Sequence, residues 1–259
     1  NLEASQYQIK IGQKIVADDL IYADKKLAIA GDSTKLEVSG LKVKEPAFGV
    51  DAYWIDKELQ ADAEAKGYVI VEPDDVLTTH LNQIINSSAS ELLGQEEVQE
   101  LLDNLKVSYP NLVDTVVPKV MPLNQVTSVM KCILEEGVPI SDLRLILESI
   151  SSMNVQKMDS DDVAERIRPK LVPLLIQKLI KFKDTVPLIT FSPELEQMIL
   201  TTVRQNPDEK MLLIEGTLAK KILSNLNEAS EQFNSEGKPV FLIVAPQIRK
   251  HVARFVRSQ

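Results

Sequence analysis

The spacing of the apolar residues changes near Gly94, and this change constrains the fold more than any other feature of the chain. Within residues 1–55, segments such as "YQIKIGQKIVADDLIY" and "KKLAIAG" alternate apolar with polar residues, which is typical of half-buried strands. After Gly94, segments such as "QEEVQELLDNLKVSYP" and "PLNQVTSVMKCILEEG" carry apolar residues at helical spacing. The sequence therefore predicts a mostly β region up to residue 55 and a helical unit after residue 94.

Strands and helices alternate in the rest of the chain. Asp56 is placed to cap a helix that Gly67 ends, and the strand "YVIV" and a helix opening with "EPDD" follow. Nearer the C-terminus, Ser192 is placed to cap a helix after the strand "VPLITF", and a further helix precedes the apolar strand "KPVFLIVAP". A buried strand between helices predicts an α/β layer in this last region.

The length favours several packed units. Cores rarely grow beyond about 250 residues before they split, so 259 residues form one large core or two to four small ones. The segment "SDDVAERIRPKLVPLLIQKLIKF" contains Pro169 and Pro173, each of which removes a backbone donor. We expect this helix to kink or break at the prolines, with a domain edge nearby.

The composition excludes several classes of function. The net charge of −9 disfavours binding to nucleic acid or to anionic lipid, because the field of the chain repels both. A single cysteine excludes an intrachain disulfide framework, and with only two histidines no zinc shell is complete. No metal or other cofactor is expected.

A search for catalytic groups finds none that the sequence supports. The nine glycines are scattered and open no phosphate-binding loop, and neither His80 nor His251 has a recognisable catalytic partner. Cys132 lies on the apolar stripe of its helix and is interpreted as a small core residue. The chain is therefore predicted to present surfaces rather than to catalyse. The alternative is an α/β hydrolase or transferase with an unrecognised site, which would show turnover or tight binding of a small molecule.

The chain is interpreted as a piece of a longer protein. It begins with Asn1 rather than with methionine, and its last segment stops inside a predicted helix. It has no signal-peptide pattern and no apolar run near the roughly 18 residues of a membrane span. We expect this fragment to be soluble.

The stretch "KEPAFGVDAYWI" places Phe48 at a bend. Pro46 forces the residue before it into an extended conformation, and Gly49 frees the backbone directly after the ring. A ring at a bend is easily left half exposed, as in the central anchor of a protein interface. The residues alone leave two interpretations open, because Phe48 also suits the closure of a local core.

This stretch, with "GYVIVEPDDVLTTHLNQII", "ELLGQEEVQELLDNLK", "YPNLVDTVVPKV" and "EEGVPISDLRLILESIS", closely resembles the cytoplasmic part of the flagellar type III export-gate proteins. They form the FlhA family, also called the flagellum/hypersensitive response/invasion protein export pore family. The match is strong over residues 1–190, and the order of strands and helices agrees to the end.

The resemblance implies an α+β fold of four small subdomains. Two are mixed β/α at the N-terminal end, one is helical, and one is α/β at the C-terminal end. The first, incomplete, comprises residues 1–23 and 73–92, the second and mostly β one comprises 24–72, the helical third 93–172, and the truncated fourth 173–259.

The resemblance also implies a chaperone-docking site, an apolar dimple between the first and second subdomains. Its acidic residue falls on Glu45, where the family often has aspartate, its central ring on Phe48 and its threonine on Thr79. The surrounding apolar positions fall on Leu27, Ile29, Val50, Val71 and Val76.

The implied function is a docking platform at the cytoplasmic face of the bacterial inner membrane, without catalysis. The implied partners are export chaperones with bound flagellar substrates, other components of the export apparatus, and further copies in a nine-membered ring. This fragment itself is expected to contact neither membrane nor nucleic acid. The equivalent component of a virulence injectisome is the alternative, although "EPAFG" followed by "AYWI" favours the flagellar branch.

Overall fold

A computed structural model describes residues 3–31, 37–180, 185–207, 209, 211–234 and 239–257. The chain divides into two compact units, Asn1–Ala164 and Glu165–Gln259, with the boundary inside the long helix α8 (Ser160–Leu179). Each unit is described separately. The predicted segments "SDDVAERIRPKLVPLLIQKLIKF" and "KPVFLIVAP" include residues 181–182 and 238, which lie outside the described residues.

The first unit begins with a hairpin that contacts a long helix. Strands β1 (Gln6–Ile11) and β2 (Lys14–Leu20) pair antiparallel, and Gly12 takes a positive φ of 57° in the turn between them. Helix α2 (Pro73–Ser87) begins with the predicted proline and has two aspartates in its first turn. The hydroxyl of Tyr7 lies 2.5 Å from Nδ1 of His80, which joins the hairpin to α2.

A four-stranded antiparallel sheet follows, with the strand order β4-β5-β3-β6. Its strands are β3 (Lys25–Ala30), β4 (Leu41–Lys44), β5 (Asp51–Asp56) and β6 (Tyr68–Val71). Because side chains alternate along a strand, Tyr53 and Ile55 face a core with Ala63 of α1 (Gln60–Ala65), and Trp54 faces Val76 of α2. Both faces of the sheet are therefore buried, and Trp54 is a core residue.

The helix between β5 and β6 begins differently from the prediction. A 3₁₀ turn, η1 (Lys57–Leu59), precedes α1, and the Asp56 side chain makes no capping hydrogen bond. Asp56 instead pairs with Lys25 on the neighbouring strand, at 2.5 Å. Gly67 follows the end of the helix with a φ of 89°, as predicted.

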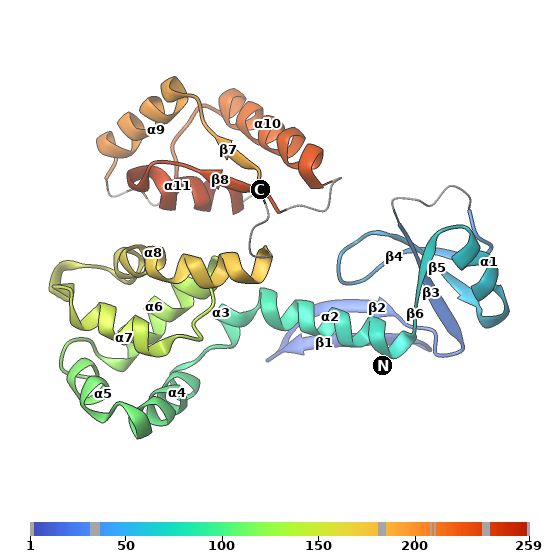
Figure 1. Ribbon diagram of the computed structural model, residues 1–259, viewed down its shortest axis with the longest axis horizontal. Helices are drawn as coiled ribbons and strands as arrows, with labels where there is room; N and C mark the ends of the chain where they lie inside the picture. The colour runs from blue at the N-terminus through green and yellow to red at the C-terminus, as the bar shows by residue number, and fades with distance from the viewer. Residues whose placement is uncertain are drawn as a thin grey trace. The chain divides into compact units, whose positions relative to one another are not determined.

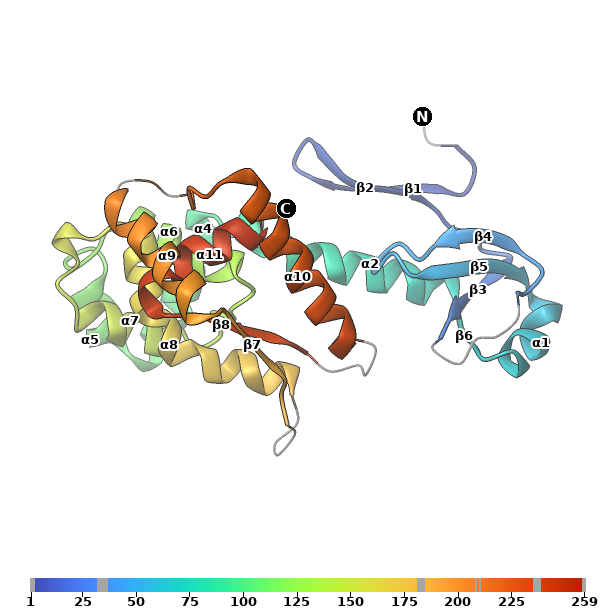
Figure 2. The ribbon, with the colours of Figure 1, turned by 90° about the horizontal axis from the view of Figure 1, so that it is seen from above.

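The predicted helical region forms a bundle, and Figures 1 and 2 both show α2 running from the sheet to it. Its helices are α3 (Ala89–Leu92), α4 (Gln95–Ser108), α5 (Pro110–Val116), α6 (Leu123–Glu135) and α7 (Leu143–Ser151), and a short 3₁₀ turn η2 (Val155–Lys157) follows. Cys132 is half-buried rather than a full core residue, and its Sγ lies 3.2 Å from Oδ1 of Asp161.

The second unit has helices around a two-stranded parallel sheet. Its elements after α8 are β7 (Leu188–Thr190), α9 (Pro193–Gln205), α10 (Gly216–Asn234), β8 (Phe241–Ile243) and α11 (Pro246–Arg257). Ser192 caps α9 as predicted, since its hydroxyl accepts a hydrogen bond from the N–H of Leu195. Helix α8 continues through Pro169 and Pro173, so the chain does not break there. The α+β fold class is confirmed.

Candidate functional site

The loop between β4 and β5, residues 45–50, is closed by its own backbone. The N–H of Glu45 donates to the carbonyl of Val50 at 2.8 Å, and the N–H of Gly49 donates to the carbonyl of Glu45, also at 2.8 Å. Gly49 has a φ of 68°, a conformation that L side chains rarely adopt. Pro46 and Gly49 therefore form the predicted bend, and the loop is a defined turn.

The carboxylate of Glu45 lies inside this loop. The residue is only 3% exposed, and its two oxygens accept hydrogen bonds from the N–H groups of Ala47, at 2.9 Å, and Phe48, at 2.7 Å. The family resemblance placed this acidic group at the edge of a docking site. The structure places it in the turn that carries Phe48.

The ring of Phe48 is exposed, so it does not close a local core, which was one of the two interpretations that the residues left open. It is 71% exposed and lines an open hollow of about 470 Å³. The other lining residues come from one face of α2 and are Thr79, Asn82, Gln83, Asn86 and Ser87. We call these six residues the Phe48 hollow. All six are uncharged, so an aromatic surface stands beside a strip of amide and hydroxyl groups.

The remaining predicted site residues divide into two sets. Leu27 and Val76 are buried, and Ile29 and Val71 are half-buried in the core between the sheet and α2. Val50 is exposed at the end of the loop. The structure therefore brings Phe48 and Thr79 together at the hollow, while the buried residues support the sheet and helix on which they stand.

Sequence reasoning missed the amide-bearing residues of α2. Asn82, Gln83 and Asn86 follow Thr79 by three, four and seven positions, so they lie on the same helix face. That spacing alone predicts a shared polar face, but the apolar residues of the same helix dominate its hydrophobic periodicity.

Tyr7 and His80 form a pair next to Thr79 along α2, in which Tyr7 is half-buried and His80 is buried. Burial, then the nearby carboxylates of Asp19 and Glu45, raise the pKa of Tyr7 to about 12. Tyr7 is therefore neutral at physiological pH, and its ring meets that of His80 edge to face. The pair ties the β1–β2 hairpin to α2.

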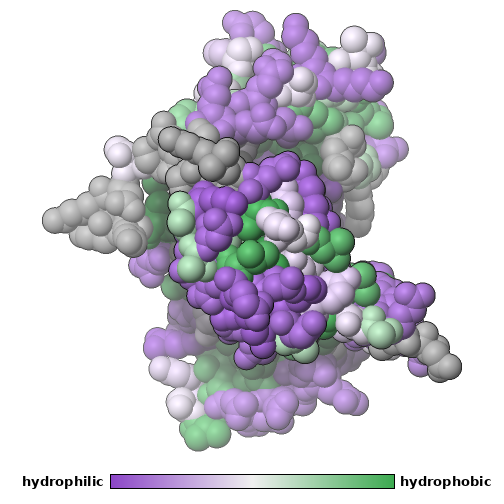
Figure 3. All heavy atoms as spheres, turned by 90° about the vertical axis from the view of Figure 1, so that its right-hand side faces the viewer, coloured by the Kyte–Doolittle hydropathy of each residue, from purple (hydrophilic) through white to green (hydrophobic). Residues whose placement is uncertain are grey.

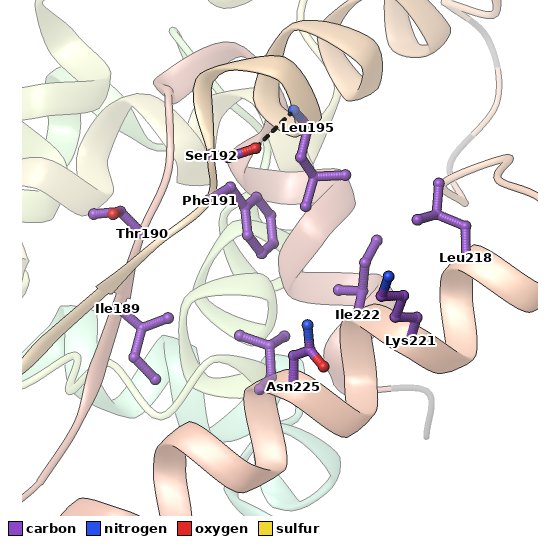
Figure 4. A pocket seen from close by; sticks show the side chains of 10 residues that line it. Ile189, Thr190, Phe191, Ser192, Leu195, Leu218, Lys221, Ile222 and Asn225 are labelled. Atoms are coloured by element: carbon purple, nitrogen blue, oxygen red, sulfur yellow. Dashed lines mark hydrogen bonds between the residues drawn. The ribbon is translucent and has the colours of Figure 1, made fainter.

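The second unit contains a groove of about 400 Å³ between β7, the start of α9 and α10 (Figure 4). Its lining residues are Ile189, Thr190, Phe191, Ser192, Leu195, Leu218, Lys221, Ile222, Asn225 and Leu226. We call it the β7–α10 groove. Ile222 is 6% exposed and belongs to the core of this unit, and Phe191, Leu195 and Leu218 pack against that core. The groove is thus a gap in a core rather than a surface built around an exposed anchor.

The described residues offer little for other chemistry. Across them, no three or more His, Cys, Asp or Glu side chains are grouped so as to hold a metal ion. A search of the described helices also finds none that is long and apolar enough to span a membrane. Hydrophilic side chains cover most of the face shown in Figure 3, with hydrophobic ones in smaller patches.

Solved structures share this fold. The Chlamydia pneumoniae CdsV and CdsO protein complex matches with a TM-score of 0.80 and 23% identity, covering 100% of this chain and 76% of that one. The nonameric EscV cytosolic domain from the type III secretion system matches with a TM-score of 0.73 and 20% identity, covering 100% and 76%. The fold is therefore that of the cytosolic domains of type III secretion proteins.

The family follows from sequence. The model of the FHIPEP family matches residues 1–259, and the chain belongs to this family, as its motifs predicted. It is 31% identical over 251 residues to the flagellar biosynthesis protein FlhA of Helicobacter pylori, a match that covers 96% of this chain and 34% of that protein. The chain spans 34% to 37% of the length of the first curated relatives it matches.

Proposed function

We propose that this chain is a docking platform of the flagellar type III export gate, and that export chaperones with bound flagellar substrates dock at the Phe48 hollow. The observation that carries the proposal is the exposed ring of Phe48, which the loop presents beside Thr79. Large aromatic side chains that a fold leaves exposed at a hollow are frequent anchors of protein interfaces.

The flagellar interpretation is favoured over the injectisome one by the curated relatives. Flagellar biosynthesis proteins from several bacteria are 28% to 31% identical to this chain, whereas solved structures with the same fold are 18% to 24% identical. The second candidate function is that of the equivalent injectisome component, which would bind a different cargo at the same hollow.

The chemistry of the hollow defines what docks there. An apolar side chain of the partner covers the Phe48 ring, and backbone or amide groups of the partner pair with Asn82, Gln83 and Asn86. Because the lining residues are uncharged, attraction at this contact does not depend on charge pairs. The affinity at the hollow should therefore depend only weakly on salt.

Assembly and location complete the proposal. The nonameric EscV neighbour and the CdsV complex with CdsO support self-association into a ring and contact with another component of the export apparatus. We place the platform at the cytoplasmic face of the inner membrane, as part of a longer protein. Its role there is binding rather than catalysis, so driving energy comes from elsewhere in the apparatus.

Calorimetric titration with a purified export chaperone–substrate complex tests the site. Phe48→Ala should weaken binding by about 30-fold or more, as expected for loss of an interface anchor, without changing the fold. Val69→Ala is the matched control, because Val69 is 60% exposed on β6 but does not line the hollow. Equal affinities for wild type and Phe48→Ala would refute the site.

A further inference from the structure

The loop that presents Phe48 holds a buried carboxylate whose hydrogen bonds are all local. Glu45 is 3% exposed, and its oxygens accept from the N–H groups of Ala47 and Phe48. A buried charge is costly unless hydrogen bonds compensate it, and bonds to an ionised acceptor are the stronger kind. In the described part of the chain no lysine or arginine pairs with Glu45, and the nearest lysine in sequence, Lys44, pairs with Asp51. The two backbone N–H groups therefore provide the compensation.

These hydrogen bonds act on the residue that matters for docking. Phe48 takes no part in either β4 or β5, so the ladder hydrogen bonds of the sheet do not fix its backbone. The direct constraint on its N–H is the Glu45 carboxylate, at 2.7 Å. The backbone hydrogen bonds of Glu45 with Val50 and with Gly49 close the loop. They do not involve the N–H groups of Ala47 and Phe48, which donate instead to the Glu45 side chain.

We propose that Glu45 is a positioning residue, whose carboxylate orders the loop so that the Phe48 ring faces the hollow, and that it does not itself bind the partner. This inference rests on the proposed docking function. It assigns the acidic residue a different role from the one its sequence position implied, since the residue is only 3% exposed and its carboxylate accepts hydrogen bonds within the loop.

Three substitutions separate positioning from direct recognition. Glu45→Ala removes both acceptors, and Glu45→Gln keeps one acceptor while setting an N–H₂ donor against a backbone donor. Glu45→Asp keeps the carboxylate, and aspartate readily accepts from N–H groups two residues further along in turns. A positioning role therefore predicts that Glu45→Asp keeps the loop ordered, whereas Glu45→Gln loses that order as Glu45→Ala does.

The first readout needs no partner. Amide hydrogen exchange at Ala47 and Phe48 should accelerate at least about tenfold in Glu45→Ala and in Glu45→Gln, and should stay near wild type in Glu45→Asp. Exchange in α2 serves as the internal control for the fold. Unchanged exchange at Ala47 and Phe48 in Glu45→Ala would overturn the inference.

The second readout is calorimetric titration with the same chaperone–substrate complex. Glu45→Ala and Glu45→Gln should bind about five- to tenfold more weakly and Glu45→Asp within about twofold of wild type, because ordering the loop then opposes binding. If exchange accelerates while affinity stays the same, or if Asp binds as weakly as Ala, the positioning role is wrong. Normal binding by Phe48→Ala, in contrast, would remove the docking site itself, so the two failures are distinguishable.

Discussion

The Phe48 hollow and the β7–α10 groove have similar volumes but differ in what their walls do for the fold. The Phe48 hollow, of about 470 Å³, joins a 71% exposed ring to the polar face of a helix. The β7–α10 groove, of about 400 Å³, is lined by side chains that also form or cover a core. The volumes therefore do not distinguish the two hollows, whereas the role of their walls in stability does.

Because of this difference, substitutions at the two hollows affect different quantities, affinity at one and stability at the other. A side chain that is exposed in the free protein contributes little to stability, so its removal affects mainly the interface. A core side chain beside a groove contributes to stability whether or not anything binds there. Substitutions in the two hollows should therefore give opposite patterns of stability and affinity.

The largest effect is expected in the β7–α10 groove. Ile222→Ala should lower the free energy of unfolding of the second unit by about 2–4 kcal/mol, because it deletes a buried branched side chain from the core. Urea denaturation measures the loss, and amide exchange in α10 assigns it to this unit. If Ile222→Ala kept normal stability but weakened chaperone docking, the β7–α10 groove would be a binding surface rather than part of a core.

A smaller loss is expected in the sheet that carries the Phe48 loop. A Cβ on Gly40 would lie 2.6 Å from the backbone oxygen of Trp54, which cannot move without disturbing β5. Gly40→Ala should lower the free energy of unfolding of the first unit by about 1–3 kcal/mol. Gly216→Ala is the control, since no atom lies within 4 Å of its added Cβ. Equal stability of the two variants would show that the sheet accommodates the methyl group.

The smallest effect concerns pH and the second unit. Burial, followed by the charge of Lys250, lowers the pKa of His251 from its ordinary value of 6.5, against an opposing hydrogen bond to the backbone of Glu209. The unfolded chain then binds a proton more readily than the folded one, so stability is present above about pH 6.5 and is lost as pH falls toward the folded pKa.

Urea denaturation at about pH 7.5 and at about pH 5.5 measures this loss, which a single proton limits to about 1.4 kcal/mol per pH unit. His251→Gln should reduce the difference between the two pH values. An unchanged difference in that variant would assign the pH dependence to other groups.

Local sequence signals predicted the bend at Phe48 because they depend on neighbouring residues. Pro46 and Gly49 restrict and free the backbone on either side of the ring, and the family resemblance then favoured exposure over burial. The pairing of Phe48 with Thr79 also came from the resemblance, since no local pattern joins residues 31 positions apart.

The direction of the Glu45 side chain was not predictable from the sequence. It depends on closure of the 45–50 loop, which brings the N–H groups of Ala47 and Phe48 within reach of the carboxylate. Helix α8 shows the same limit, because it continues as one helix through the two prolines, so of the predicted kink or break only the break is excluded. Strand β8 comprises only Phe241–Ile243, which is shorter than its apolar run suggested.

One titration series tests the central claim that the Phe48 hollow, and not the β7–α10 groove, receives the chaperone–substrate complex. Wild type, Phe48→Ala and Ile222→Ala are titrated with the same complex at a temperature at which all three are folded. We predict affinity about 30-fold weaker for Phe48→Ala and unchanged for Ile222→Ala. Normal binding by Phe48→Ala together with weakened binding by Ile222→Ala would contradict the account.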